Sequence, residues 1–419
     1  MRRFNPKKYE RAPGGERAGA SVHNHIPVTM RIYVVTLTAC TLCIGAGMFA
    51  GTRTAADACG DIPGFREAEG TYVPDWPEPG VANREWHLPW PEMPGLDENP
   101  VTPEKVHLGR LLFFDPIVSG DNTTSCAACH HPDFGLADGR KKALGFGARG
   151  AATDRTGGMR LGRASPSLWN AAFNANQFWD GRAQDLEHQA SFPIQAPDEM
   201  NQDPDELVWE LQEVPAYVTL FEKTFGGAGR DAVTYERAVQ AITSFERTFL
   251  SLDAPFDRYA RGAENALTEQ QQRGFALFRS KRLNCIACHK LPTFSDTELH
   301  VIGVPEEGDR DPGRAKVPGE GPFGAFKVPT LRNITRTAPY MHNGALETLE
   351  EVIDFYADGA GLALNDPAYE IDAEIAPFVI DDAEKAALLA FFEALTDESL
   401  KPAPPAAVPS GLPVTAVSP

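Results

Sequence analysis

The chain has 419 residues, of which 42% are hydrophobic and 23% are charged, and its net charge is −19. This length suffices for two domains of ordinary size, and the low hydrophobic fraction excludes a polytopic membrane protein. A chain this acidic repels phosphate backbones, which excludes nucleic-acid binding.

The first predicted element is an export signal. Residues 32–50 form a long apolar run that is preceded by Arg31, as in the hydrophobic region of a secretory signal. Residues 56–58 (Ala-Asp-Ala) offer a small-residue cleavage site just before Cys59. The sequence therefore predicts a signal sequence over residues 1–58 and a periplasmic protein. An uncleaved anchor remains open because the run nearly spans a bilayer, and membrane attachment is expected only if this segment is retained or lipidated.

Residues 59–103 are rich in Pro, Trp and acidic residues, which predicts an extended arm lying on the surface. Further along the chain, apolar stripes at helical spacing predict helices over residues 235–250, 268–278 and 383–395. Thr268, and either Asp381 or Asp382, are the predicted N-caps of the last two helices. Strand signals are scarce. Residues 401–419 are a Pro/Ala-rich segment with little to pack, which predicts a disordered tail.

Two C-x-x-C-H motifs carry the chemistry of the chain. In this pattern both thiols form thioethers with haem, and the adjacent His binds the iron. A zinc site made from the two Cys pairs is the alternative, but it leaves unexplained why His follows both pairs. Two covalently attached haem c groups are therefore predicted at Cys126, Cys129 and His130, and at Cys285, Cys288 and His289.

The distance between the two motifs leaves room for a complete domain around each haem. Helices that are joined by long irregular loops bury little by themselves, so a large apolar group must fill each domain. The predicted fold is mostly α, with two cytochrome c-like domains over residues 104–262 and 263–400, each holding one haem c.

Four further segments resemble the bacterial dihaem cytochrome c peroxidases and their MauG relatives. They are LGRLLFFD at 108–115, QFWDGR at 177–182, APFDRY at 254–259, and PTLRN through PYMHNG at 329–344. The resemblance runs from about Leu108 to Tyr356. It implies that the N-terminal haem reacts with peroxide, while the C-terminal haem stores and relays electrons.

The resemblance also implies catalytic roles for three residues. Trp179 matches the tryptophan between the two haems, which passes electrons; without the resemblance, a buried packing role would be preferred. Gln189 and Glu199 match the distal pair above the peroxide-reactive iron, and a carboxylate there can move a proton between the peroxide oxygens.

The sequence departs from the peroxidase pattern at three positions. Phe146 stands where peroxidases place a distal His, so the first haem is expected to be open at its sixth position, as in the MauG branch. Tyr356 stands where a Met binds the second iron, and Met341 is the alternative axial ligand. Ala164 replaces the Asn that contributes to the family's calcium site, so calcium is doubtful.

The leading hypothesis is a periplasmic oxidoreductase that reacts with hydrogen peroxide and oxidises a partner protein, as the MauG branch does. Two alternatives remain. One is an ordinary cytochrome c peroxidase that receives electrons from a small cytochrome or cupredoxin, and the other is a dihaem electron carrier without catalysis.

Overall fold

The computed structural model describes residues 62–68, 71–75, 86–317 and 321–415, which belong to one compact unit. The predicted signal sequence and Cys59 lie outside these residues. Within the described ranges, no helix is long and apolar enough to cross a membrane.

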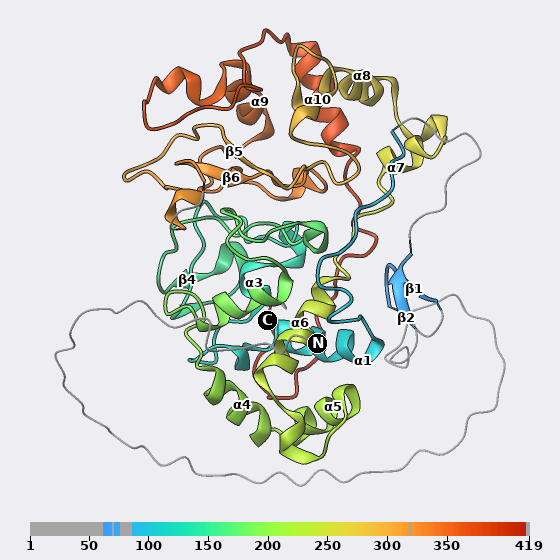
Figure 1. Ribbon diagram of the computed structural model, residues 1–419, viewed down its shortest axis with the longest axis vertical. Helices are drawn as coiled ribbons and strands as arrows, with labels where there is room; N and C mark the ends of the chain where they lie inside the picture. The colour runs from blue at the N-terminus through green and yellow to red at the C-terminus, as the bar shows by residue number, and fades with distance from the viewer. Residues whose placement is uncertain (1–61, 69–70, 76–85, 318–320, 416–419) are drawn as a thin grey trace. The chain divides into compact units, whose positions relative to one another are not determined.

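The described chain is mostly helical, which confirms the predicted fold class (Figure 1). Helices of the first half are α1 (Pro103–Phe114), α2 (Cys126–Cys129), α3 (Leu186–Gln195), α4 (Pro204–Glu213), α5 (Pro215–Phe225) and α6 (Tyr235–Glu246). Those of the second half are α7 (Pro255–Ala260), α8 (Glu269–Phe278), α9 (Leu349–Ala357) and α10 (Asp382–Glu393). The described strands form three short two-stranded antiparallel sheets, namely β1 (Phe65–Ala68) with β2 (Thr71–Pro74), β3 (Ala148–Arg149) with β4 (Thr156–Gly157), and β5 (Leu299–Val301) with β6 (Ala325–Lys327).

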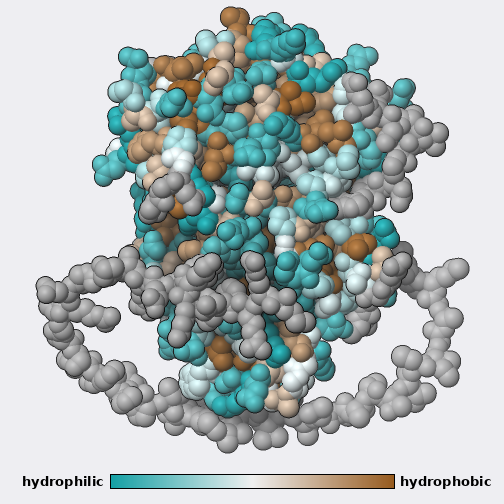
Figure 2. Space-filling model, in the orientation of Figure 1, coloured by the Kyte–Doolittle hydropathy of each residue, from teal (hydrophilic) through white to brown (hydrophobic). Residues whose placement is uncertain are grey.

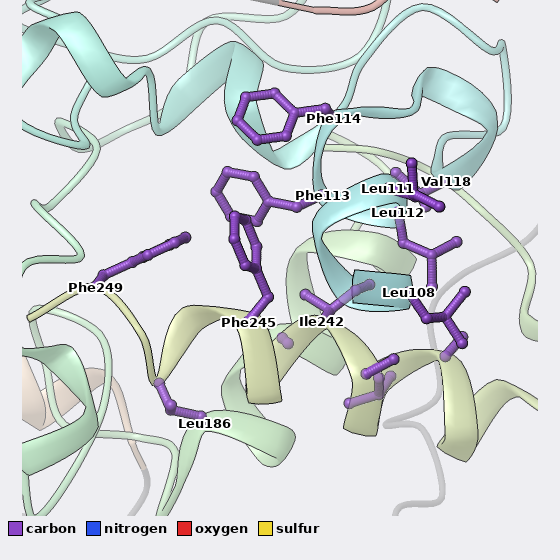
Figure 3. Packing of buried hydrophobic residues seen from close by; sticks show 14 of the residues in the cluster. Leu108, Leu111, Leu112, Phe113, Phe114, Val118, Leu186, Ile242, Phe245 and Phe249 are labelled. Atoms are coloured by element: carbon purple, nitrogen blue, oxygen red, sulfur yellow. The ribbon is translucent and has the colours of Figure 1, made fainter. Parts of the chain in front are cut away.

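The first hydrophobic core forms where α1 crosses α6. Gly109 makes this crossing possible, because a Cβ atom there would lie 1.8 Å from the carbonyl oxygen of Ala241. Phe113 then meets Phe245 edge to face, with ring centroids 5.5 Å apart (Figure 3).

The second core repeats this construction where α8 crosses α10. A Cβ atom on Gly274 would lie 1.9 Å from the carbonyl oxygen of Ala387. Phe278 packs against Phe391 with ring centroids 5.3 Å apart. In each core, one crossing helix precedes the C-x-x-C-H motif and the other follows it. Both motifs therefore have the same position in the chain relative to their pair of crossing helices.

The predicted helix starts are confirmed. Thr268 accepts a hydrogen bond from the backbone N–H of Gln271, and Asp381 accepts one from that of Glu384. Helix α6 ends at Glu246, earlier than the predicted residue 250, because the following residues turn and bury Arg247.

The predicted surface arm is corrected by the structure. Ile62, Phe65, Met93 and Val101 are buried in the first core. Pro-rich backbone avoids helices, as expected, but its apolar side chains still gain by leaving water.

The predicted tail and domain boundary are corrected as well. Val408 is buried, and Leu412 and Val414 pack against the first core, so the described part of the tail, up to residue 415, is ordered by contact. The second core begins at Phe256, within the segment predicted to end the first domain, because that ring packs 5.1 Å from the ring of Phe294.

Candidate functional site

The two motif histidines are oriented in the same way. The Nδ1 atom of His130 lies 3.1 Å from the carbonyl oxygen of Leu136, and that of His289 lies 3.1 Å from the carbonyl oxygen of Phe294. A carbonyl only accepts hydrogen bonds, so Nδ1 carries the proton and Nε2 presents its lone pair. This is the tautomer and orientation that a metal-binding imidazole requires.

The acceptor carbonyls are held by unusual backbone. Leu136 has φ of 59° and Phe294 has φ of 56°, although neither residue is glycine. Left-handed backbone at bulky residues is costly and persists where the surroundings enforce it. The same costly conformation at both positions indicates that each site requires a carbonyl oxygen directed at Nδ1 of its histidine.

The four cysteines of the motifs form no disulfide. Burial raises the pKa of Cys129 to about 11 and that of Cys285 to about 12, so both thiols are neutral. Across the described ranges, the one group of three or more possible metal ligands is Cys288, Asp296 and His300. The two Cys pairs do not meet, which excludes a zinc site built from both.

A cavity opens beside the first motif. It brings the motif together with both predicted distal residues, and its lining includes Cys126, Cys129, His130, Gln189, Pro193, Ile194, Glu199 and Ile242.

Glu199 is placed to hold a proton in this cavity. Burial raises the pKa of its carboxyl group, and the neighbouring Asp198 carboxylate raises it further. The loop that carries Phe146 packs directly on this segment, and the Phe146 N–H donates to the Asp198 carbonyl oxygen at 3.1 Å. His130 is the one imidazole among the residues that line the cavity.

Two polar residues that sequence reasoning missed also line the cavity. Ser125 and Glu246 each have a buried side-chain oxygen without a hydrogen-bond partner. Burial raises the pKa of Glu246 to about 8, and Glu187 adds to the effect. The sequence could have predicted that Glu246 faces inward, because it lies four residues after Ile242 on the buried stripe of α6.

These features fit a haem group. Neutral thiols, an oriented imidazole and apolar walls meet in one cavity, and its orphaned oxygens need a further polar partner.

At the second motif, Tyr356 is the aromatic residue brought close by α9. Its phenol interacts electrostatically with Cys288 and Cys285, and burial raises its pKa. Met341, the alternative axial residue, lies in a left-handed turn with φ of 74° and accepts a hydrogen bond from Gly344.

Trp179 lies at the junction of the two halves. Its indole Nε1 donates to the carbonyl oxygen of Ala164 at 2.9 Å, and its own carbonyl accepts from the N–H of Lys327 in β6 at 2.7 Å. The Ala164 carbonyl, which is the one oxygen that this residue could offer to a cation, therefore already accepts a hydrogen bond from the indole.

Charged and titratable residues surround this junction. Arg163 pairs with Asp180 at 2.7 Å and with Asp311 at 2.6 Å, which joins segments from both halves. His342 is buried, with Nε2 2.7 Å from the Glu306 carboxylate.

Comparisons with known proteins point to dihaem peroxidases and MauG proteins. A family model described as di-haem cytochrome c peroxidase matches residues 103–265. The chain is 40% identical over 307 residues to the methylamine utilization protein MauG of Methylorubrum extorquens, covering 73% of this chain and 82% of that protein. It is 34% identical over 265 residues to the cytochrome c551 peroxidase of Pseudomonas aeruginosa, covering 62% and 73%. The solved structure of a MauG-like protein associated with microbial copper homeostasis matches with a TM-score of 0.66 and 29% identity, covering 78% of this chain and 97% of that chain.

Proposed function

The chain belongs to the family of dihaem cytochrome c peroxidases and MauG proteins, and from this premise we propose that it reduces hydrogen peroxide at the first cavity and oxidises a partner protein. Members of this family are peroxidase-type haem oxidoreductases. The apolar run over residues 32–50 supports export, so the proposed location is the periplasm.

Two haem c groups are proposed as cofactors. Cys126 and Cys129 would attach the first, and His130 would bind its iron. Cys285 and Cys288 would attach the second, and His289 and Tyr356 would bind its iron. When bound, haem supplies the redox-active iron at which peroxide is reduced.

The protein's own contribution at the first cavity is proton handling and exclusion of water. Glu199, whose pKa is raised by burial, can take a proton from one oxygen of a bound peroxide and return it to the other. Gln189 can hydrogen-bond the peroxide and fix its orientation, because its amide both donates and accepts. Pro193 and Ile194 keep the surroundings apolar, which strengthens these polar contacts.

Trp179 is the residue through which we propose that electrons pass between the two halves. Its indole is fixed by hydrogen bonds on both sides of the junction, so its position is defined relative to each motif. The second domain would supply electrons through it, and a partner protein would ultimately be oxidised.

The proposed assignment to the MauG branch depends mainly on Phe146, which stands where peroxidases have a distal His. Its loop packs against the segment that bears Glu199, and a phenyl ring cannot bind iron. The first site should therefore react with peroxide without prior reduction.

The test is to mix the fully oxidised protein with one equivalent of hydrogen peroxide and to follow its absorption spectrum. A rapid change is expected, together with a high-spin ferric signal in electron paramagnetic resonance before mixing. Phe146→His should supply an imidazole and suppress both, whereas Phe146→Leu should retain both. A low-spin protein that is inert to peroxide would refute the proposal and favour an electron carrier.

Ordinary peroxide detoxification is the second candidate, and the likeness to the cytochrome c551 peroxidase favours it. It predicts steady turnover with a reduced small cytochrome or cupredoxin, and activation by one-electron reduction. Inclusion of a reductant in the peroxide assay separates the two functions.

A further inference from the structure

His300 is a histidine of the second half that contacts the second C-x-x-C-H motif and that the proposed mechanism does not use. It is the middle residue of β5, and its Nδ1 atom lies 3.8 Å from the sulfur of Cys288. The proposed function joins that sulfur covalently to haem. The imidazole is therefore a direct neighbour of the point at which the second cofactor is attached.

Both ring nitrogens of His300 face carboxylates. Nε2 lies 3.2 Å from a carboxylate oxygen of Asp296, and Nδ1 makes a shorter contact with the carboxylate of Asp372. An ionised carboxylate only accepts hydrogen bonds, so each ring nitrogen must carry a proton, and the ring is an imidazolium cation. The same geometry argues against a metal ion at Cys288, Asp296 and His300, because a ring with two N–H groups has no lone pair to give.

Water screens these charges only in part. The side chain of His300 is 18% exposed and that of Asp296 is 5% exposed. Lys290 lies 3.6 Å from Asp296 as a second cation. Among the described residues, His300 is the one cation that pairs with both carboxylates. Removing the imidazolium would therefore leave a net negative charge beside Cys288.

We propose that the His300 imidazolium raises the reduction potential of the second haem. The inference rests on the proposed function, which attaches that haem at Cys285 and Cys288. A fixed positive charge beside the haem disfavours ferric iron, which is the more positively charged state, whereas unbalanced carboxylates would favour it. His300 is thus a positioning and tuning residue, which makes the second haem a better acceptor of electrons and takes no part in bond breaking.

The test measures both haem potentials in the dihaem protein and its variants at pH 8, where ordinary carboxyl groups are ionised. In His300→Gln, the ratio of reduced to oxidised second haem at a fixed potential should fall about tenfold, a shift of about 59 mV for one electron. Asp372→Asn removes a negative charge and should shift the potential in the opposite direction. The double variant restores the net charge and should return close to the wild type.

Arg310→Gln is the matched control, because it also removes a cation from a carboxylate partner in the second half of the chain. Arg310 pairs with Asp366 at 2.5 Å, but its side chain is 50% exposed, so water screens its charge. Both haem potentials should stay in place in this variant.

An unchanged second-haem potential in His300→Gln would overturn the inference, as would an equal shift in Arg310→Gln. Shifts of the same sign in His300→Gln and Asp372→Asn would also overturn it, because a purely structural role in tying Asp372 to β5 predicts that both variants disturb the site alike. If His300→Gln does not retain both haems, Asp372→Asn decides, and its second-haem potential must rise.

Haem content distinguishes failure of this inference from failure of the proposed function. If mass spectrometry shows no covalent haem on the wild type, the proposed function is wrong. If both haems are attached and the second potential does not follow the charge, only the role of His300 is wrong.

Discussion

Two carboxylic acids share the first cavity, and their surroundings give them different properties. Glu199 lies beside the exposed Asp198, and burial is the larger cause of its raised pKa. Glu246 is buried on α6 and has an oxygen without a partner. Glu199 is therefore suited to exchange a proton during reaction, while Glu246 is held neutral by the fold.

Replacing Glu199 by Gln should slow the reaction with hydrogen peroxide by roughly 10²–10⁴-fold, the range for general acid–base catalysis. An amide has the shape of the acid but cannot relay its proton. Stopped-flow absorption at one equivalent of peroxide gives the rate. Glu210→Gln is the control, because that side chain bonds Gln202 and Asn122 outside the cavity lining. Equal rates in both variants would remove Glu199 from the mechanism.

Glu246 should make the folded state less stable as pH rises. Its pKa is raised from an ordinary value of 4.5 to about 8 on folding, so the folded state holds a proton that the unfolded state has lost in this window. The stabilisation is complete below about pH 4.5 and is lost as pH rises through about 8.

Glu246→Gln should flatten that part of the pH profile. The free energies of unfolding of wild type and variant should diverge by up to about 4 kcal/mol between pH 5 and pH 8, since one pKa unit corresponds to about 1.4 kcal/mol. Denaturant titrations at several pH values measure this difference. Parallel profiles would show that folding does not shift the pKa of Glu246.

At the scale of elements, both domains depend on a helix crossing that only glycine permits. Gly109 of α1 and Gly274 of α8 each face a carbonyl oxygen of the partner helix at a distance that leaves no room for a methyl group. The repeated crossing explains how helices with modest apolar faces hold two similar cofactor sites.

Gly109→Ala should therefore destabilise the first domain, although alanine is the better helix former by about 1 kcal/mol. Overpacking against Ala241 should cost about 1–3 kcal/mol net, or more if the helices separate. Guanidinium denaturation measures the loss. Gly162→Ala is the matched control, since no heavy atom lies within 4 Å of a Cβ there. A stabilised Gly109→Ala variant would contradict the tight crossing.

Considered as a whole, the molecule joins its two halves through a polar junction. Arg163 links Asp180 to Asp311, Trp179 bonds Lys327, and the Ala164 N–H donates to the carbonyl oxygen of His342 at 2.7 Å. By contrast, the face shown in Figure 2 carries apolar side chains in small separate groups among polar ones.

Arg163→Met should loosen this junction, because it removes the cationic partner of Asp311 and leaves the buried Asp180 with Arg182 alone. The expected cost is about 2–4 kcal/mol, with faster hydrogen exchange at the Lys327 amide that bonds Trp179. Arg230→Met breaks an exposed pair with Glu213 and should cost less than about 1 kcal/mol. Equal exchange rates in both variants would show that the pair does not hold the junction.

The sequence by itself determined the features that depend on neighbouring residues. The C-x-x-C-H motifs, the helix at residues 235–246 and the caps at Thr268 and Asp381 follow from covalent spacing, periodicity and local hydrogen bonding. The placing of Gln189 and Glu199 in one cavity with His130 was anticipated through the family resemblance.

Only the tertiary structure decided which distant residues meet. It placed Ser125 and Glu246 in the cavity, put Lys327 beside Trp179, and packed the segment around Val408 on the first core. Such contacts depend on how helices cross and loops return. Apart from the place of Glu246 on the inward stripe of α6, the sequence contains no local signal for them. Local sequence motifs thus predicted the residues that would attach the cofactors. Long-range packing determined which charged residues surround them and how far burial shifts their pKa values, because desolvation depends on every segment that excludes water.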